Sequence, residues 1–247
     1  MDPAAITVRS LELEQRSAVV HVLAEAFEHD PMQAWLFPNA KRRVRRLRRF
    51  YERDVMVRLE GTATACLFGS RGVAFWQPPG GGETLSIGSA LRLAPCFSSV
   101  AAHHPIAATR VLAAVLRQRP EEPHWYLTHL AVRPMDQGRG LGRALLEWGI
   151  ERADEEGVGT YLETTNPDNL PFYRAAGYSQ VGLVRVDGAP NVWTLWRAPG
   201  QTSAGQQVDP VERSEEGLCA EADQHDGGTG DDGGEPGRAA EDRDGTW

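Results

Sequence analysis

Three glycines alternate with other residues at Gly138, Gly140 and Gly142, and a segment with helical apolar spacing follows at once. A glycine-rich turn that opens a helix can bind an anion, because the first N–H groups of a helix lack internal partners and the helix dipole adds positive charge. Arg139 and Arg143 can add fixed charge beside it. The pattern indicates a phosphate-binding turn, although an ordinary tight connection explains this turn alone equally well.

The surrounding sequence predicts the elements that would position this turn. We expect a strand over 123–132, a helix from the turn to about residue 156, and a strand over 159–165. A short helix should follow, with Asn169 as its N-cap and Gly177 as its stop. Strands over 179–186 and 190–198 form a closing hairpin.

The first half of the chain predicts a second set of elements. Residues 6–11 alternate like a strand, a helix must end before Pro31, and a hairpin is expected over 62–79. Two helices are expected within 84–119. A further helix over 41–60 carries one apolar stripe, formed by Val44, Leu47, Tyr51 and Val55. Seven of its first nine residues are basic, which favours a solvated face over a nucleic-acid site because no aromatic residues are interleaved.

Composition divides the chain into two regions. Residues 199–247 hold 13 acidic residues, 3 arginines and 10 glycines, so we expect an acidic, disordered tail. Because the whole chain has a net charge of −8, residues 1–198 carry about +2 and are expected to form a single folded domain. Three scattered cysteines indicate neither disulfides nor a metal site. Without a signal peptide or membrane span, we expect a cytoplasmic monomer or homodimer that binds no membrane.

Two motifs, at residues 137–142 and 166–178, resemble the GNAT superfamily of acetyl-CoA-dependent acetyltransferases. The first is Gln137-Gly-Arg-Gly-Leu-Gly142, which fits the Q/R-x-x-G-x-G/A signature, and the second is "NPDNLPFYRAAGY". The closest pattern is that of the puromycin N-acetyltransferase branch. The resemblance implies an α/β fold whose mixed, mostly antiparallel sheet is splayed between two parallel strands and flanked by helices.

The resemblance also implies roles for residues of the acetyl-CoA half. The pyrophosphate of acetyl-CoA would bind the backbone of Gly138, Arg139, Gly140, Leu141, Gly142 and Arg143, with Gln137 orienting the turn. The pantetheine arm would run beside Leu130, Ala131 and Val132, whose N–H groups include the oxyanion donor. Tyr173 would protonate the departing thiolate. Asn169 is favoured over Asn166 as a further pantetheine contact.

The acceptor half is less constrained by these motifs. Glu163 is our candidate general base, although a carboxylate that braces the following loop fits as well; His124 and His129 are expected to be packed or surface side chains. His29, Asp30 and Trp35 are expected to form the acceptor wall, with Trp76 and the loop over 186–191 facing them. The preferred acceptor is a small-molecule primary amine, and a peptide or protein amine is the alternative.

Two other interpretations remain open at this point. In a Rossmann unit, Glu163 would bind a ribose, but the G-x-G-x-G turn lacks the G-x-G-x-x-G spacing and comes after some 130 residues instead of opening its domain. A non-catalytic acyl-CoA-binding module, with the tail as a partner-binding arm, would bind acetyl-CoA without acetylating any amine. The Tyr173 motif favours an enzyme.

Overall fold

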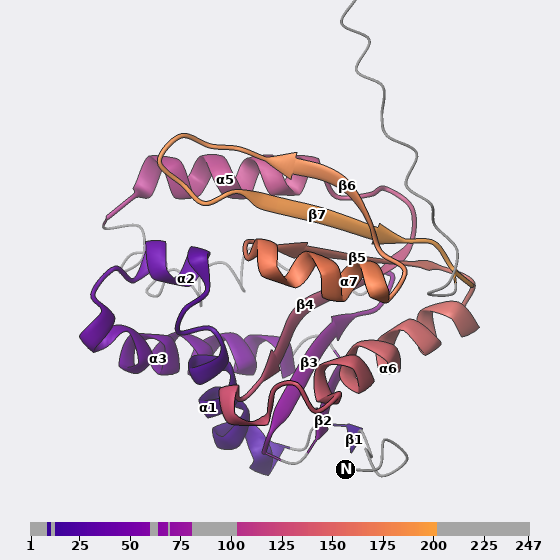
Figure 1. Ribbon diagram of the computed structural model, residues 1–247, viewed down its shortest axis with the longest axis horizontal. Helices are drawn as coiled ribbons and strands as arrows, with labels where there is room; N and C mark the ends of the chain where they lie inside the picture. The colour runs from indigo at the N-terminus through magenta and orange to yellow at the C-terminus, as the bar shows by residue number, and fades with distance from the viewer. Residues whose placement is uncertain (1–8, 11–12, 60–63, 69, 81–102, 202–247) are drawn as a thin grey trace, which may run out of the picture. The chain divides into compact units, whose positions relative to one another are not determined.

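The computed structural model describes residues 9–10, 13–59, 64–68, 70–80 and 103–201. The predicted tail over 199–247 lies outside these residues from position 202 onward, as do residues 81–102 of the segment expected to hold two helices. Seven strands form one mixed sheet in the order β1-β2-β3-β4-β5-β7-β6 (Figure 1). The strands are β1 (Arg9–Ser10), β2 (Thr64–Phe68), β3 (Gly72–Gln77), β4 (His124–Val132), β5 (Gly159–Thr164), β6 (Ser179–Val184) and β7 (Val192–Arg197).

Helices flank this sheet, as the sequence predicts for an α/β fold. They are α1 (Arg16–Ala26), α2 (Pro31–Leu36), α3 (Ala40–Leu59), α5 (Pro105–Arg117), α6 (Leu141–Glu155) and α7 (Leu170–Ala175), with short 3₁₀ turns at Leu13–Gln15, Pro134–Asp136 and Pro167–Asn169. No helix among the described residues is both long and apolar enough to span a bilayer. β4 and β5 are the parallel pair, and the other neighbouring strands pair antiparallel.

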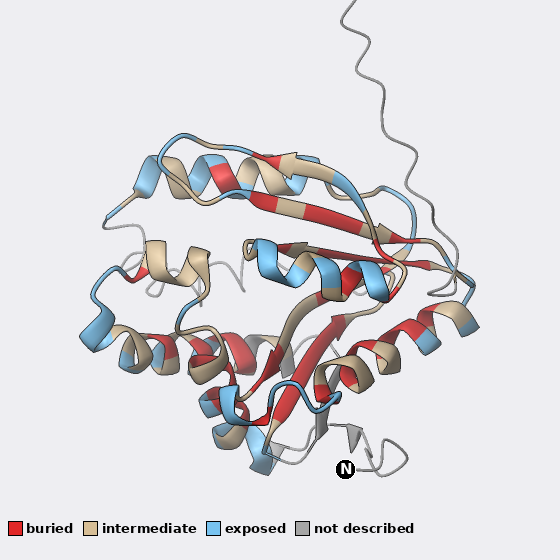
Figure 2. Cartoon of the chain, in the orientation of Figure 1, coloured by how far each residue is buried: buried red, intermediate tan, exposed pale blue. Residues whose placement is uncertain are grey.

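The two faces of β3 and β4 pack against different helices. On one face, Ala74 and Trp76 share a core cluster with Leu145 of α6. On the other, Val73 and Phe75 pack against α1 and α3. This division follows from the alternation of side chains along a strand, and Figure 2 shows the buried residues concentrated on the central strands.

The apolar stripe predicted for α3 is confirmed. Leu47, Tyr51 and Val55 are fully buried, and Val44 packs partly buried against the same cluster. Because these positions recur at helical spacing, one side of α3 faces the sheet while the exposed Lys41, Arg42, Arg45 and Arg49 face solvent.

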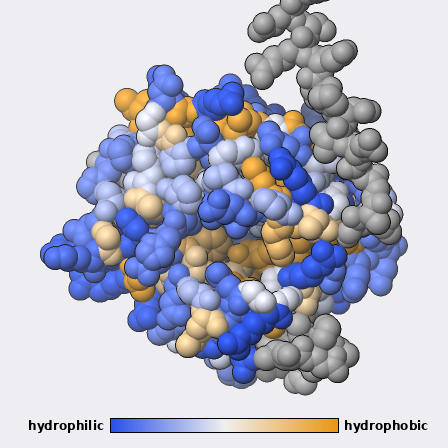
Figure 3. Space-filling view, viewed as in Figure 1, coloured by the Kyte–Doolittle hydropathy of each residue, from blue (hydrophilic) through white to orange (hydrophobic). Residues whose placement is uncertain are grey.

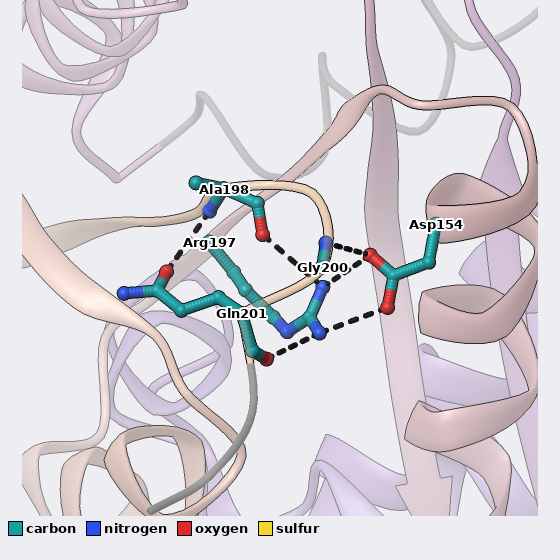
Figure 4. A network of polar contacts seen from close by, with 5 residues as sticks. All are labelled: Asp154, Arg197, Ala198, Gly200 and Gln201. Carbon is teal, nitrogen blue, oxygen red and sulfur yellow. Dashed lines mark hydrogen bonds and ion pairs between the residues drawn. The ribbon is translucent and has the colours of Figure 1, made fainter. Parts of the chain in front are cut away.

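A charged network joins β7 to the end of α6 (Figure 4). Both terminal nitrogens of Arg197 donate to Asp154, at 2.8 and 2.9 Å, and the N–H of Gly200 donates to the same carboxylate at 2.7 Å. Carbonyls of Ala198 and Gln201 accept further bonds from the guanidinium. These contacts fasten the last described residues to the helix that begins at the glycine-rich turn.

Candidate active site

The glycine-rich turn opens α6 in the predicted place. Gly138 and Gly140 have φ angles of 72° and 81°, in the left-handed region that suits glycine. The first hydrogen bond of the helix runs from the N–H of Ala144 to the carbonyl of Gly140 at 3.1 Å, so the preceding N–H groups point away from the helix body. The turn therefore has the features of an anion site.

Side chains on either side of the turn hold its conformation. Gln137 donates from Nε2 to the carbonyl of Val132 at 3.1 Å, which ties the turn to the end of β4. Buried Asp136 pairs with Arg133, and half-exposed Arg139 lies 3.7 Å from it. Arg143 instead contacts Glu147 at 2.7 Å and the carbonyl of Ala175 at 3.2 Å, so it joins α6 to α7.

β4 and β5 pair over only the first part of their length. His124–Leu127 pairs with Gly159–Leu162, and the ladder ends there although β4 continues to Val132 and β5 to Thr164. The edge of β4 that faces β5 is therefore without ladder partners over Leu130–Val132 in the described part of the chain. A strand edge of this kind can hydrogen-bond an extended ligand.

A bulge interrupts β4 just beyond the last paired residue. Opposite β3, Phe75 faces His129 and Trp76 faces Leu127, which leaves Thr128 as the extra residue. Its hydroxyl donates to the carbonyl of Phe75 at 3.1 Å. Because the bulge resets the alternation, Leu127 and Leu130 both pack toward the cluster beside α6. This bulge was not predicted from the sequence, although the spacing of Leu127 and Leu130 breaks strict alternation.

Tyr173 lies on the α6 side of the sheet. It is buried in the same cluster as Leu127 and Leu162, and its ring packs against those of Phe172 and Tyr178 at centroid distances of 5.2 and 5.9 Å. Burial, reinforced by the negative charge of Asp30, raises the pKa of its hydroxyl. The hydroxyl therefore stays protonated at neutral pH. In Figure 3, a hollow with apolar surface lies near the centre of the face on which Figure 1 shows α7.

Glu163 lies on the opposite face of β5 from Leu162, and its carboxylate is nearly buried. The hydroxyl of Tyr126 donates to its Oε2, and the Nε of Arg119 lies 3.6 Å from its Oε1. The guanidinium of Arg119 also stacks on the ring of Tyr126, 4.5 Å from its centroid. Burial raises the pKa of Glu163, while Arg119, Tyr126 and Tyr161 oppose the rise. A carboxylate with a raised pKa is a stronger proton acceptor than an ordinary one.

The two histidines of β4, expected to be packed or surface side chains, both pack against aromatic rings. His124 lies against the rings of Tyr161 and Trp196, at 5.6 and 5.8 Å. His129 is enclosed by the rings of Phe27, Tyr51 and Phe75 at 5.7 to 6.1 Å. Burial, aided by Arg58 and opposed by Asp54, lowers the pKa of His129 to about 4. This imidazole is therefore neutral at physiological pH.

Asp30 links the expected acceptor wall to the end of β5. Its carboxylate caps α2 by accepting from the N–H of Gln33 at 3.1 Å, and it accepts from the hydroxyl of Thr165 at 3.0 and 3.2 Å. Its negative charge also contributes to the raised pKa of Tyr173. Of the three residues expected in the wall, Asp30 is the one that the described contacts join to the site.

The other residues expected around the acceptor have different surroundings. His29 is exposed, and Trp35 stacks on His104 at 4.6 Å. Our expectation for Trp76 was wrong, because its ring is fully buried against Gly149 of α6. The loop over 186–191 does approach the α2 segment, since Val186 and Ala189 pack in one cluster with Met32.

The predicted N-cap of α7 needs a correction. Asn169 occupies the N-cap position, but its side chain makes no capping hydrogen bond. Asn166 does cap, because its Oδ1 accepts from the N–H of Asp168 at 3.1 Å in the preceding 3₁₀ turn. The 3₁₀ turn runs directly into α7, so the backbone at Asn169 is already helical when α7 begins. Gly177, with a φ of 90°, follows the end of α7 as predicted.

Part of the chain is similar in sequence to known acetyltransferases. Residues 95–178 match the model of the acetyltransferase (GNAT) family. A 98-residue stretch is 36% identical to an uncharacterised N-acetyltransferase of Schizosaccharomyces pombe, covering 38% of this chain and 39% of the relative. A stretch of the same length is 38% identical to the N-alpha-acetyltransferase RimI of Mycobacterium tuberculosis, covering 37% of this chain and 60% of the relative. The family model covers residues 95–178 alone, and the chain spans less than two thirds of either relative's length, so these matches show a likeness to GNAT-family acetyltransferases over this segment.

Solved structures match the fold over a larger share of the chain. A Corynebacterium glutamicum structure, described as histone acetyltransferase HPA2 and related acetyltransferase, superposes with a TM-score of 0.58 at 24% identity, over 79% of this chain and 97% of that one. The polyamine N-acetyltransferase of Drosophila melanogaster gives a TM-score of 0.50 at 17% identity, over 78% and 99%. At these identities the two structures show the shared fold alone.

Proposed function

We propose that this protein transfers the acetyl group of acetyl-CoA to a primary amine of a small molecule, by direct attack within a ternary complex. The observation that carries the proposal is the early end of the β4–β5 ladder beside the glycine-rich start of α6. This arrangement offers an extended ligand both a free strand edge and an anion site. Acetyl-CoA, with a pyrophosphate at one end and amides along its arm, fits both features.

The donor would be held largely by main-chain atoms. The N–H groups of residues 138–143 would take the pyrophosphate, and Gln137 holds the turn for this task through its bond to Val132. The pantetheine arm would pair with Leu130–Val132, and a backbone N–H near Leu130 or Ala131 would stabilise the oxyanion. Asn169, next to the start of α7, is a further candidate contact for this arm.

The proposed reaction includes two proton transfers to or from side chains, one involving Glu163 and the other Tyr173. Glu163 accepts a proton from the acceptor ammonium, and the neutral amine then attacks the thioester carbonyl carbon. The new C–N bond replaces the C–S bond, the amide nitrogen loses its second proton to solvent, and the departing thiolate takes a proton from Tyr173. Glu163 and Tyr173 lie on opposite faces of β5, so acceptor and leaving group would be served from different sides.

The preferred acceptor is a small amine with an aromatic or amino-acyl part, such as the aminonucleosides acted on by the branch whose pattern the sequence resembles. An α-amino group has a reference pKa near 8 and therefore needs only modest help from a base. A peptide or protein N-terminus is the second candidate, which the similarity to the N-alpha-acetyltransferase RimI favours.

The test is acetyl-CoA consumption and thiol release with aminonucleosides, aminoglycosides, polyamines, amino-acid amides and short peptides. Turnover of an amine class identifies the acceptor, whereas acetyl-CoA binding without turnover would support a non-catalytic binding module. Tyr173→Phe should lower kcat by about tenfold or more with little change in acetyl-CoA affinity, because it removes one buried hydroxyl. Phe172→Leu, on the same helix, is the matched packing control. An unchanged kcat in Tyr173→Phe would remove this residue from the mechanism.

A further inference from the structure

Four polar side chains meet on the face of the sheet that carries Glu163. They come from separate segments: Arg119 follows α5, Tyr126 lies on β4, and Tyr161 and Glu163 share one face of β5. Each of the three partners perturbs the pKa of the carboxyl group of Glu163. The cluster lies outside both sequence motifs and has no part in the donor site.

The two oxygens of Glu163 have different surroundings. Oε2 accepts the hydroxyl hydrogen of Tyr126, whereas Oε1 faces the Nε of Arg119 at a distance of 3.6 Å. The positive charge of Arg119 therefore lies beside the oxygen that Tyr126 does not hold. Tyr126 fixes the rotation of the carboxylate, because it holds the other oxygen.

Arg119 is itself held by its surroundings. The Cζ of its guanidinium lies over the Tyr126 ring, 4.5 Å from the ring centroid, which holds the positive charge beside the carboxylate. Its side chain is only 20% exposed and that of Glu163 12%, so water screens the pair weakly. Without a nearby positive charge, a carboxylate this buried would favour its neutral form and could not accept a proton.

We propose that Arg119 is a positioning residue, whose guanidinium, held over Tyr126, keeps the Glu163 carboxylate ionised and in place to take the proton of the acceptor amine. Only the transfer of a proton from the acceptor amine to Glu163 rests on the proposed function. Among the described residues, the other titratable groups on this face are Arg58 of α3, whose charge acts on Tyr126, together with Asp54 and the neutral His129. Asp54 and Arg58 form a pair of their own at 2.8 Å, so their charges largely offset each other at Glu163.

The first readout does not depend on turnover. The ¹³C carboxyl signal of Glu163, assigned by its loss in Glu163→Gln, should titrate at higher pH in Arg119→Met than in the wild type, by about one pH unit or more. Arg119→Lys should restore much of the difference, since it keeps the charge. Arg110→Met, which removes an exposed arginine of α5, should leave the titration unchanged. A titration of Glu163 that is identical in Arg119→Met and the wild type would overturn the proposal.

The second readout tests Glu163 as the general base. It is the pH profile of kcat/KM, measured with one of the amines named under the proposed function. For Arg119→Met we expect about tenfold lower kcat/KM on the acidic limb and a change within about twofold at high pH. An equal loss at every pH, with unchanged Glu163 titration, would show a purely structural role. A shifted carboxyl titration without turnover of any amine would leave the positioning role standing and refute the proposed function instead.

Discussion

Acidification should destabilise this fold through His129, a histidine buried behind the bulge of β4. In the folded protein burial lowers its pKa from 6.5 to about 4, whereas in the unfolded chain it returns to the ordinary value. The unfolded state therefore binds a proton between these two values and the native state does not, so stability is complete above pH 6.5 and is lost as the pH falls. Between pH 7.5 and 5.0 the loss from this one group is about 2 kcal/mol.

Urea denaturation at both pH values measures this loss. With a slope of about 1–3 kcal/mol per molar urea, the midpoint should fall by about 1 M in the wild type. His129→Gln should be less stable at pH 7.5, because the ring packs against Phe27, Tyr51 and Phe75, but its midpoint should change less between the two pH values. His21→Gln, at an exposed position of α1, should keep the wild-type dependence. Equal pH dependence in His129→Gln and the wild type would refute the reasoning.

Two further predictions concern α6 and its attachments. Gly149→Ala should destabilise the fold by about 2 kcal/mol or more by denaturation, because a Cβ there would lie 2.1 Å from the fully buried Trp76 ring and this clash exceeds the gain of about 1 kcal/mol in helix propensity. Gly142→Ala should leave the free energy of unfolding unchanged, because the nearest atoms to its Cβ would lie 3.7 Å away. Equal destabilisation by Gly149→Ala and Gly142→Ala would contradict the packing argument. Asp154→Ala should lower the free energy of unfolding by about 3 kcal/mol, because it leaves the Arg197 guanidinium, whose side chain is only 5% exposed, without its partner. Arg197→Met should lower it less, because the Asp154 side chain is 29% exposed and can be rehydrated. The reverse order of melting temperatures would contradict this argument.

Local sequence pattern was sufficient to predict the elements that would position the proposed donor site. The stripe of α3 predicts which side of that helix is buried, because it recurs at helical spacing over several turns. The glycines at 138 and 140 predict the turn, because the left-handed backbone they adopt is costly for other residues. Donor recognition through main-chain atoms needs little beyond such a turn and a strand edge, so a short motif can carry it.

The acceptor side depends on contacts that no local pattern contains. Asp30 meets Thr165 across 135 residues of chain, and Glu163 meets Tyr126 and Arg119 from three separate segments. The sequence was sufficient to suggest Glu163 as a candidate general base, because it lies at the end of a predicted strand. It could not show that an arginine before β4 accompanies this carboxylate, because a lone arginine after a helix has many other uses on a protein surface.

The separation of β4 and β5 shows why the two halves differ in this respect. Parallel strands should continue to pair for as long as both remain extended, yet this ladder stops at Leu127 and Leu162. The bulge at Thr128 lies at that point and resets which side chains face α6, while Glu163 and its partners occupy the opposite face. A sheet with a buried charged cluster and an interrupted ladder is expected to be less stable than a continuous apolar sheet. Both features lie where the proposed function needs them, because the proposed site must admit a thioester and remove a proton from an amine.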